Sequence, residues 1–335
     1  MSLNLPEKSA YDLITVGDST IDTFIKIHDA TVECDINNKD CRICIKYGEK
    51  IPVDSISHQV AGNAANVAVG AQKLGLKTAI NTNLGDDENG SLIKKKLKES
   101  QVSLEFAQIH PNNESNLSVV LTFRGERTIF VYHQSWDYYL PELPPCSILY
   151  LTSTAESFTK SDLVNQVCQY IDKNKPMLIF NPGTYQLKTG VKKYPQILER
   201  CHLLIVNSQE AKKILEIDES DENQKDLLSK LLLLGPKNIV ITDGDNGSFG
   251  TDGKSFFRVG IFPVQLVEKT GAGDAYSSGL IAGLFYKLPL SEAMIWGTIN
   301  ASHVIQEIGT QNGLLAKDDL ERHRKAVPEL MAAEF

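Results

Sequence analysis

Short apolar segments alternate with helical segments along most of this sequence, and that alternation limits the folds available to it. The strand-like segments are residues 11–17, 77–81, 147–151, 176–180, 203–206 and 238–242. Helical patterns cover about residues 64–74, 88–99, 159–173, 208–215 and 222–233. Strands separated by helices of about ten to fifteen residues are typical of βαβ units. The sequence therefore predicts an α/β fold with a mostly parallel sheet.

Two regions interrupt the alternation, because residues 23–58 and 104–133 carry strand signals without a convincing helix. In the second region, two strand-like runs flank Arg124-Gly125-Glu126, a hairpin pattern with a glycine in its turn. A chain of 335 residues could form two domains, but no linker rich in proline or serine divides it. We therefore predict one large α/β domain, formed by residues 1–22, 59–103 and 134–335, and a discontinuous β lid, formed by residues 23–58 and 104–133.

The overall charge argues against a polyanionic partner. The chain has 34 Lys and Arg against 42 Asp and Glu, a formal net charge of −8. Its one basic cluster, residues 94–98, lies in an amphipathic helical pattern and is read as a solvated face. The sequence has no apolar run of about 18 residues, and residues 1–10 lack the apolar core of a signal peptide. We expect no nucleic-acid or membrane partner and a cytoplasmic location.

The cysteines are expected to be free thiols. The chain has six, and in a reducing compartment free thiols are the ordinary state. Cys41 and Cys44 form a C-x-x-C pattern with Cys34 nearby, but no second C-x-x-C or close histidine completes a zinc set. For these three residues we predict buried or half-buried thiols and no metal.

The segment from Lys269 to Gly279, KTGAGDAYSSG, carries the strongest chemical signal. A strand-like run, residues 261–267, precedes it, and a helical pattern follows from about 272 to 286. Gly271 and Gly273 permit a tight turn whose N–H groups point outward at the helix N-terminus, a local anion site. Asp274 lies in the first turn, where a carboxylate could accept a proton from a hydroxyl that attacks a phosphoryl group. The alternative is that Asp274 only caps the helix.

Two common nucleotide-binding patterns are absent from the sequence. Residues 85–91 have the glycine spacing of a G-x-x-x-x-G-K-[ST] loop but are acidic and lack the lysine. Gly271 and Gly273 are not followed by the third glycine of a dinucleotide fingerprint, and the first strand ends at Gly17-Asp18-Ser19-Thr20. A P-loop nucleotide site and a Rossmann oxidoreductase are therefore excluded.

Two motifs give the chain a family resemblance, from about Tyr11 to about Gly313. Residues 270–274, TGAGD, match the C-terminal signature of the ribokinase-like carbohydrate kinases of the PfkB family. Residues 61–68, AGNAANVA, are similar to the N-terminal signature, although Ala61 stands where that family usually has glycine. The resemblance implies a three-layer α/β/α fold with a mostly parallel central sheet and a small β-sheet lid. It also implies ATP and Mg²⁺ as cofactors, with a monovalent cation as a further candidate.

The resemblance assigns roles to particular residues. Asp274 would be the catalytic base, and the N–H groups of Ala272, Gly273 and Asp274 would form an anion hole at the helix N-terminus that follows Gly271. The substrate-binding residues would be Asp22, Gly62, Asn63 and Asn66. The nucleotide-binding residues would be Asn181, near the phosphates, Asn207, Thr242, Gly244, Gly247 and Asn300, near the adenine. Glu210 and Asn207 would organise Mg²⁺, through water.

Several of these residues also have an ordinary structural interpretation. Asp22 could serve a turn at the end of a strand, and Asn63 and Asn66 could cap the helix that follows them. Glu210 could be an ordinary acid in the first turn of a helix. Asn300 could be a solvated residue on a helix face.

The acceptor side of the site is expected to come from the lid and the N-terminal half. Candidate contributors are Lys46, Tyr47, Phe123, Arg124, His133 and Trp136. Arginines in a hairpin more often form surface pairs, so for Arg124 and Arg127 we expect pairing with Glu126. Pentoses such as ribose, fructose-type hexoses, 2-keto-3-deoxy sugar acids and nucleosides all remain candidate acceptors, with a sugar phosphate less favoured.

The expected function is ATP-dependent phosphoryl transfer to a hydroxyl of a small sugar-like substrate. One alternative is a nucleoside kinase, and another is a non-catalytic ligand-binding or regulatory protein on the same fold. The second alternative predicts loss of Asp274, Glu210 or the glycines, and all are present. A lid with one apolar face and an exposed edge also predicts a homodimer formed through the lid.

Overall fold

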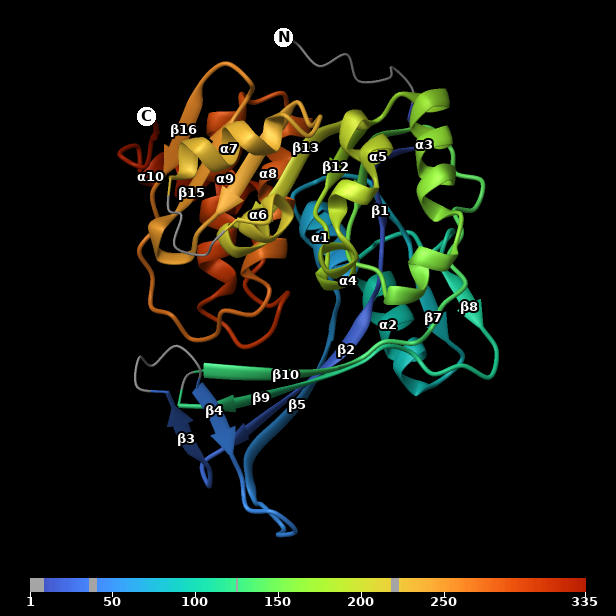
Figure 1. Cartoon of the computed structure of the whole chain (residues 1–335), viewed down its shortest axis with the longest axis vertical. Coiled ribbons are helices and arrows are strands. Elements are labelled where there is room, and N and C mark those ends of the chain that lie inside the picture. The colour runs from blue at the N-terminus through green and yellow to red at the C-terminus, as the bar shows by residue number, and fades with distance from the viewer. Residues whose placement is uncertain (1–8, 36–40, 125, 218–222) are drawn as a thin grey trace.

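The computed structural model describes residues 9–35, 41–124, 126–217 and 223–335, and a nine-stranded sheet runs through its centre (Figure 1). The strand order is β17-β16-β15-β14-β13-β12-β11-β1-β6. The strands are β1 (Tyr11–Val16), β6 (Thr78–Asn81), β11 (Cys146–Leu151), β12 (Met177–Phe180), β13 (Cys201–Asn207), β14 (Asn238–Thr242), β15 (Ser248–Thr251), β16 (Phe256–Val259) and β17 (Ala332–Glu334). From β6 to β14 the neighbours pair in parallel, and from β14 to β17 they are antiparallel.

Helices cover both faces of this sheet, which confirms the predicted three-layer fold. On one face lie α3 (Leu163–Asn174), α5 (Pro195–Arg200), α6 (Ser208–Leu215) and α7 (Gln224–Leu232). On the other face lie α1 (Asn63–Lys73), α8 (Ala272–Phe285), α9 (Leu290–Val304) and α10 (Lys317–Ala326). The remaining helices are α2 (Glu88–Glu99), α4 (Thr184–Thr189), η1 (Glu156–Lys160), η2 (Val191–Lys193) and η3 (Gly244–Asn246).

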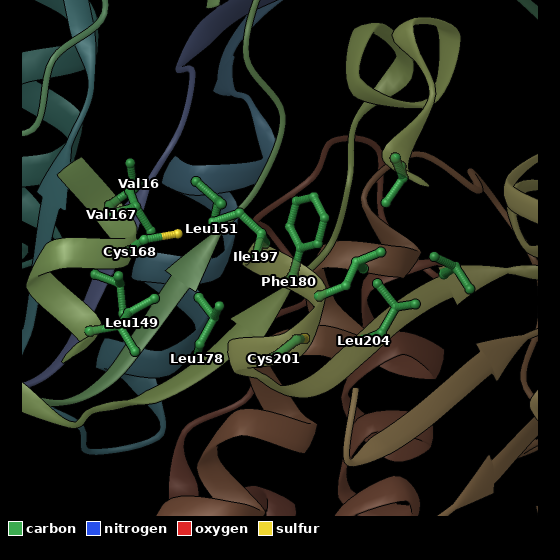
Figure 2. Close-up of a cluster of buried hydrophobic side chains, with 14 of the residues drawn as sticks. Val16, Leu149, Leu151, Val167, Cys168, Leu178, Phe180, Ile197, Cys201 and Leu204 are labelled. Atoms are coloured by element: carbon green, nitrogen blue, oxygen red, sulfur yellow. The ribbon is translucent and has the colours of Figure 1, made fainter. Parts of the chain in front are cut away.

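The two cores follow from the alternation of side chains along the strands. Leu149 and Leu151 of β11 pack with α3 and α5 in the cluster of Figure 2, whereas Ile148 and Tyr150 belong to the opposite core. Successive side chains of a strand point to opposite faces, so a strand that is apolar throughout supplies both cores. The continuous apolar runs read from the sequence are therefore the buried central strands.

Most predicted elements occur where the sequence places them, with one clear error. The helix α2, the helix α6 and the strand β14 have the predicted bounds, and Gly75, with φ +91°, follows α1. Residues 261–267 are irregular and not the predicted strand. The sheet edge beyond β16 is taken by β17, which pairs with β16 from the C-terminal part of the chain. Residues 261–267 lie outside the sheet, and the place beside β16 is taken by β17.

A second sheet of four strands lies beside the central layer, in the order β10-β9-β2-β5 (Figure 1). Its strands are β2 (Thr20–Ile27), β5 (Val53–Ala61), β9 (Leu117–Phe123) and β10 (Glu126–Tyr132). β9 and β10 form the predicted hairpin, of which Gly125 lies outside the described residues. Two further pairs are β3 (Thr31–Cys34) with β4 (Cys41–Cys44), and β7 (Asn83–Gly85) with β8 (Gln108–His110).

The cysteines of the β3–β4 pair differ from the expectation. Cys34 and Cys41 form a disulfide, with 4.0 Å between their Cα atoms, and both residues are exposed. The antiparallel register sets them directly opposite each other, a relation between two strands that spacing within one strand does not reveal. Cys44 is a half-buried free thiol, and Cys146, Cys168 and Cys201 are buried free thiols, as expected.

Two kinds of structural feature are absent from the described residues. Those residues contain no helix that is both long and apolar enough to cross a membrane. Within the same residues, no group of three or more His, Cys, Asp or Glu side chains is arranged to hold a metal ion.

Candidate active site

The first turn of α8 carries the residues that are predicted to form the anion hole. Gly271 precedes the helix with φ +86°, and a Cβ atom there would lie 2.6 Å from Thr310 Cα, so only glycine fits. The N–H groups of Gly273 and Asp274 belong to the first turn, where the helix offers no carbonyl partner. The N–H of Ala272 donates to the Lys269 carbonyl at 3.3 Å. The helix dipole and the first-turn N–H groups make this turn a site for an anion.

Asp274 is held on both of its oxygens by side chains of α1. Asn63 Nδ2 donates to Oδ1 at 2.9 Å, and Asn66 Nδ2 donates to Oδ2 at 2.7 Å. Burial raises the pKa of Asp274 to about 6, against the effect of the bonds from Asn66 and Asn63. The alternative that these two asparagines cap α1 is wrong, because the N-cap is Gly62 and no side chain bonds there. Their amides orient the carboxylate.

Asn66 is itself fixed by a polar segment near the C-terminus. Its Oδ1 accepts hydrogen bonds from Thr310 Oγ1 and from Gln311 Nε2, each at 2.9 Å. All three side chains are buried. The sequence analysis missed Thr310 and Gln311, whose only local signal is a polar stretch between two glycines, Gly309 and Gly313.

The predicted acceptor residues lie close to Asp274. Asp22, on β2, is 7% exposed, and burial raises its pKa to about 6, with the charge of Asp274 adding to the effect. Gly62 has φ +96°, and a Cβ atom there would lie 2.6 Å from the Asp18 carbonyl oxygen. Glycine therefore lets the start of α1 approach the chain that leads into β2. Ala61 pairs with Thr20 at the end of β5, so the departure from the family signature is accommodated within a regular strand.

A cleft of about 460 Å³ opens beside the first turn of α8. Its polar end carries Gly273, Thr242, Gly244 and Gly247, three of them predicted nucleotide residues. Its other lining residues are Asp245, Ile261, Phe262, Pro263, Val264, Leu266, Lys269, Ala272, Tyr276, Thr298, Ala301, Ser302 and Ile305. Five of them belong to residues 261–267, for which the sequence predicts a strand and no part of a site. The cleft joins an apolar wall to a polar, glycine-lined end.

Two predicted nucleotide residues lie elsewhere. Asn300 is fully buried, and its Nδ2 donates to the Ala275 carbonyl at 2.8 Å and to Ser278 Oγ at 3.0 Å. Its Oδ1 accepts the N–H of Leu315 at 3.1 Å, so the amide joins α9 to α8, and Asn300 does not line the cleft. The solvated alternative is wrong, and a position near the adenine stays a prediction. Asn181 lies after β12 and does not line the cleft, and its Nδ2 donates to the Ile205 carbonyl at 2.8 Å.

Asn207 and Glu210 form a reciprocal cap at the start of α6. Glu210 N donates to Asn207 Oδ1, and Asn207 N donates to Glu210 Oε2, each at 2.8 Å. Burial raises the pKa of Glu210, and the charge of Asp274 contributes in the same direction. Glu210 therefore has the ordinary structural role of an acid in the first turn of a helix, where it helps to cap α6. A single carboxylate with an amide still fits Mg²⁺, which keeps several waters and takes oxygen ligands from phosphates.

Of the residues predicted to contact the acceptor from the lid, some are buried and others are exposed. Trp136 and Phe123 are buried, and Trp136 Nε1 donates to Asn116 Oδ1 at 3.2 Å. Tyr47 is fully exposed, and Lys46 pairs with Asp29. His133 lies 3.5 Å from a carboxylate oxygen of Asp18, and Arg124 stacks on the Phe123 ring. Arg127 pairs with Glu268, whereas Glu126 was the expected partner.

Known proteins are similar to this chain in sequence and in fold. Residues 23–317 match the family described as pfkB family carbohydrate kinase. The ATP-dependent 6-phosphofructokinase of Thermoanaerobacterium thermosaccharolyticum is 22% identical over 312 residues, 89% of this chain and 89% of that protein. The nucleoside kinase of Methanocaldococcus jannaschii has a TM-score of 0.76 at 20% identity, covering 94% of this chain and 98% of that one. The Arabidopsis thaliana ribokinase, solved with ribose and ATP, has a TM-score of 0.76 at 21% identity, covering 93% and 98%. Since the family match spans most of the chain, this protein belongs to the pfkB family of carbohydrate kinases.

Proposed function

We propose that this kinase transfers the γ-phosphoryl group of ATP to a hydroxyl of a sugar, sugar acid or nucleoside. The observation that carries the proposal is the Asp274 carboxylate, which two amides orient within the first turn of the anion-hole helix. ATP as donor is supported by the ATP-dependent 6-phosphofructokinase and by the ribokinase solved with ATP. The intact Asp274, Glu210 and glycines oppose the alternative of a non-catalytic binding protein.

The proposed reaction uses the chain's own groups in a defined order. Asp22 accepts hydrogen bonds from the acceptor and holds one of its hydroxyls near Asp274. That hydroxyl oxygen bonds to the γ-phosphorus, its proton passes to Asp274, and the bond from the γ-phosphorus to the β,γ-bridging oxygen breaks to release ADP. The N–H groups of Gly273 and Asp274 stabilise the charge on the moving phosphoryl group.

The cleft beside the anion hole supports this arrangement of ATP. Its apolar walls would take the base, and Gly244, Gly247 and Gly273 allow the phosphates to approach the backbone. Asn207 and Glu210 would hold Mg²⁺ through water, and the ion would supply charge neutralisation at the phosphates. A monovalent cation remains a candidate cofactor, which activity in potassium chloride against choline chloride tests.

We also propose that the four-stranded sheet acts as the lid and that two chains pair through it. By the register of the strands, Ile56, Phe130 and Tyr132 lie on one face, and they are 56%, 58% and 44% exposed. An apolar sheet face of this kind is covered when a second copy packs against it. Light scattering should give twice the chain mass of 37.1 kDa, and Phe130→Asp should reduce it to 37.1 kDa. A wild-type protein of one chain would contradict the dimer.

The experiment for the activity is ADP release with D-ribose, D-fructose, 2-keto-3-deoxy-D-gluconate and adenosine. Asp274→Asn should fold normally and lose about two to four orders of magnitude in turnover, because the proton acceptor is gone. Asp318→Asn, an exposed acid on α10, is the matched control and should keep full activity. Full activity of Asp274→Asn would overturn the assignment of the base.

A further inference from the structure

Arg127 connects an edge of the four-stranded sheet to the loop that forms the anion hole. Its Nη1 lies 3.1 Å from Glu268 Oε1, and the Glu268 side chain is only 11% exposed. The same oxygen accepts the N–H of Thr270 at 3.0 Å and its Oγ1 at 2.7 Å. One carboxylate oxygen therefore joins β10 to the residue that precedes Gly271. In Figure 1, β10 runs beneath the C-terminal part of the central layer.

A second connection starts at the opposite edge of the same sheet. Gln59, on β5, donates through Nε2 to the Ile308 carbonyl at 3.2 Å. The next residue, Gly309, has φ +105°, and a Cβ atom there would lie 1.6 Å from Gln59 Oε1. Glycine at 309 thus permits the contact. Thr310 follows, and it both bonds to Asn66 and packs against Gly271.

The two connections reach different parts of the proposed active site. The strands β10 and β5 are the two edges of the sheet. The β10 edge reaches the anion-hole loop through Glu268. The β5 edge reaches Asn66, and through it the Asp274 carboxylate. Asp22, the proposed acceptor-binding residue, lies on β2 between these edges.

We infer that Arg127 and Gln59 are positioning residues that make the geometry of the anion hole and of Asp274 depend on the position of the four-stranded sheet. The inference rests on the proposed function. An acceptor bound at Asp22 would hold the sheet in the position that the structure has. The anion hole and the base would then be aligned only with an acceptor present, which limits the transfer of phosphoryl groups from ATP to water.

The expected strength of the ion pair between Arg127 and Glu268 is consistent with a positioning role. Exposed ion pairs contribute about 0–1 kcal/mol, but Glu268 is mostly removed from water. When Arg127 is replaced, this carboxylate loses its cation while Thr270 still holds it. The loop therefore keeps its local bonds and loses its attachment to the sheet, so we expect a change in alignment rather than unfolding.

The kinetic test compares Arg127→Gln with Arg200→Gln, using the acceptor that releases most ADP among the four compounds above. Arg200, at the end of α5, also pairs with a carboxylate, that of Asp172, and has no proposed contact with a substrate, so it controls for the loss of an arginine and its ion pair. Arg127→Gln should lower kcat about 10- to 100-fold and change KM for ATP less than about threefold, because misplaced groups slow the reaction more than they weaken binding. Arg127→Lys should recover part of kcat, and Gln59→Ala should lower it in the same manner.

Two further outcomes separate a positioning role from a structural one. Arg127→Gln should raise the ratio of acceptor-independent to acceptor-dependent ADP release, and adding Glu268→Gln should lower kcat little further. A kcat of Arg127→Gln within twofold of that of Arg200→Gln would overturn the inference while leaving the proposed function intact.

A measurement without substrate keeps the inference testable if the wild type releases no ADP with any of the four compounds. That result would sink the proposed acceptor classes but not the coupling of the sheet to the loop. In the unliganded protein, amide hydrogen exchange of residues 266–275 should be faster in Arg127→Gln than in Arg200→Gln, with α9 unchanged. Equal exchange in residues 266–275 would refute the coupling.

Discussion

The bonds from α1 to Asp274 predict a specific change in the pH dependence of activity. The catalytic base must be ionised, so activity falls as the pH drops through its pKa, which burial raises to about 6. Asn63 opposes that effect by donating to Oδ1. Asn63→Ala removes this donor and should raise the pKa of Asp274 further.

The expected size follows from the strength of a hydrogen bond to a charged group. Such a bond contributes about 1.5–3 kcal/mol, and one pKa unit corresponds to about 1.4 kcal/mol. The acidic limb of the kcat/KM profile should therefore move up by about 1–2 pH units. Asn66 remains in place and keeps the second oxygen bound, so the variant should retain activity at high pH.

The assay is coupled ADP release between about pH 5 and pH 9, because kcat/KM reports the groups of the free enzyme. Asn165→Ala is the matched control, since Asn165 also donates to a carboxylate, that of Asp162, but at an exposed position on α3. Asp22 and Asp274 interact, so the limb reports the two carboxylates as a pair. An acidic limb that stays in place, or moves to lower pH, would refute the role given to Asn63.

Two further predictions concern stability. The pKa of Asp22 is raised to about 6 in the folded chain, so the stability that this group contributes is present below about pH 4 and lost as the pH rises through about 6. Asp22→Asn should therefore raise the free energy of unfolding at pH 8, by at most about 3 kcal/mol, and leave it unchanged at about pH 4. Denaturant titration at both pH values checks this, and a loss of stability at pH 8 would contradict it. Gly271→Ala should lower the melting temperature, because φ +86° is strained for alanine by about 1–3 kcal/mol and its methyl group would meet Thr310. Gly273→Ala is the control, since nothing lies within 4 Å of a Cβ atom there, and equal melting temperatures would count against the reasoning.

Sequence reasoning located the site where the signal was local. The anion hole depends on Gly271 and on a helix that begins at the next residue, and both can be read from adjacent positions. The reciprocal cap of Asn207 and Glu210 spans three residues and is equally local. Gly62 was assigned through the family resemblance, and its φ of +96° shows that the position needs glycine.

The errors arose where the outcome depended on distant parts of the chain. Residues 261–267 have strand composition but lie outside the sheet, where β17, from a distant part of the chain, takes the place beside β16. In the sequence Asn300 resembles an exposed polar residue. In the fold α8 packs against α9, and the Ala275 carbonyl accepts a hydrogen bond from the Asn300 amide. The partner of Arg127 is Glu268, which lies 141 positions away, while the expected Glu126 is adjacent in sequence.

The α/β fold, the glycine turn before α8 and the position of Asp274 in the first turn of a helix can be read from the amino-acid sequence. These features depend on hydrophobic periodicity and on backbone freedom within a few residues. The hydrogen bond that Asn66, 208 positions away, donates to Asp274 arises only in the folded chain, as do the bonds by which Thr310 and Gln311 fix Asn66. A side-chain hydrogen bond acts over about 3 Å and leaves no periodic trace in either segment, so the packing of α1 against α8 had to bring these groups together.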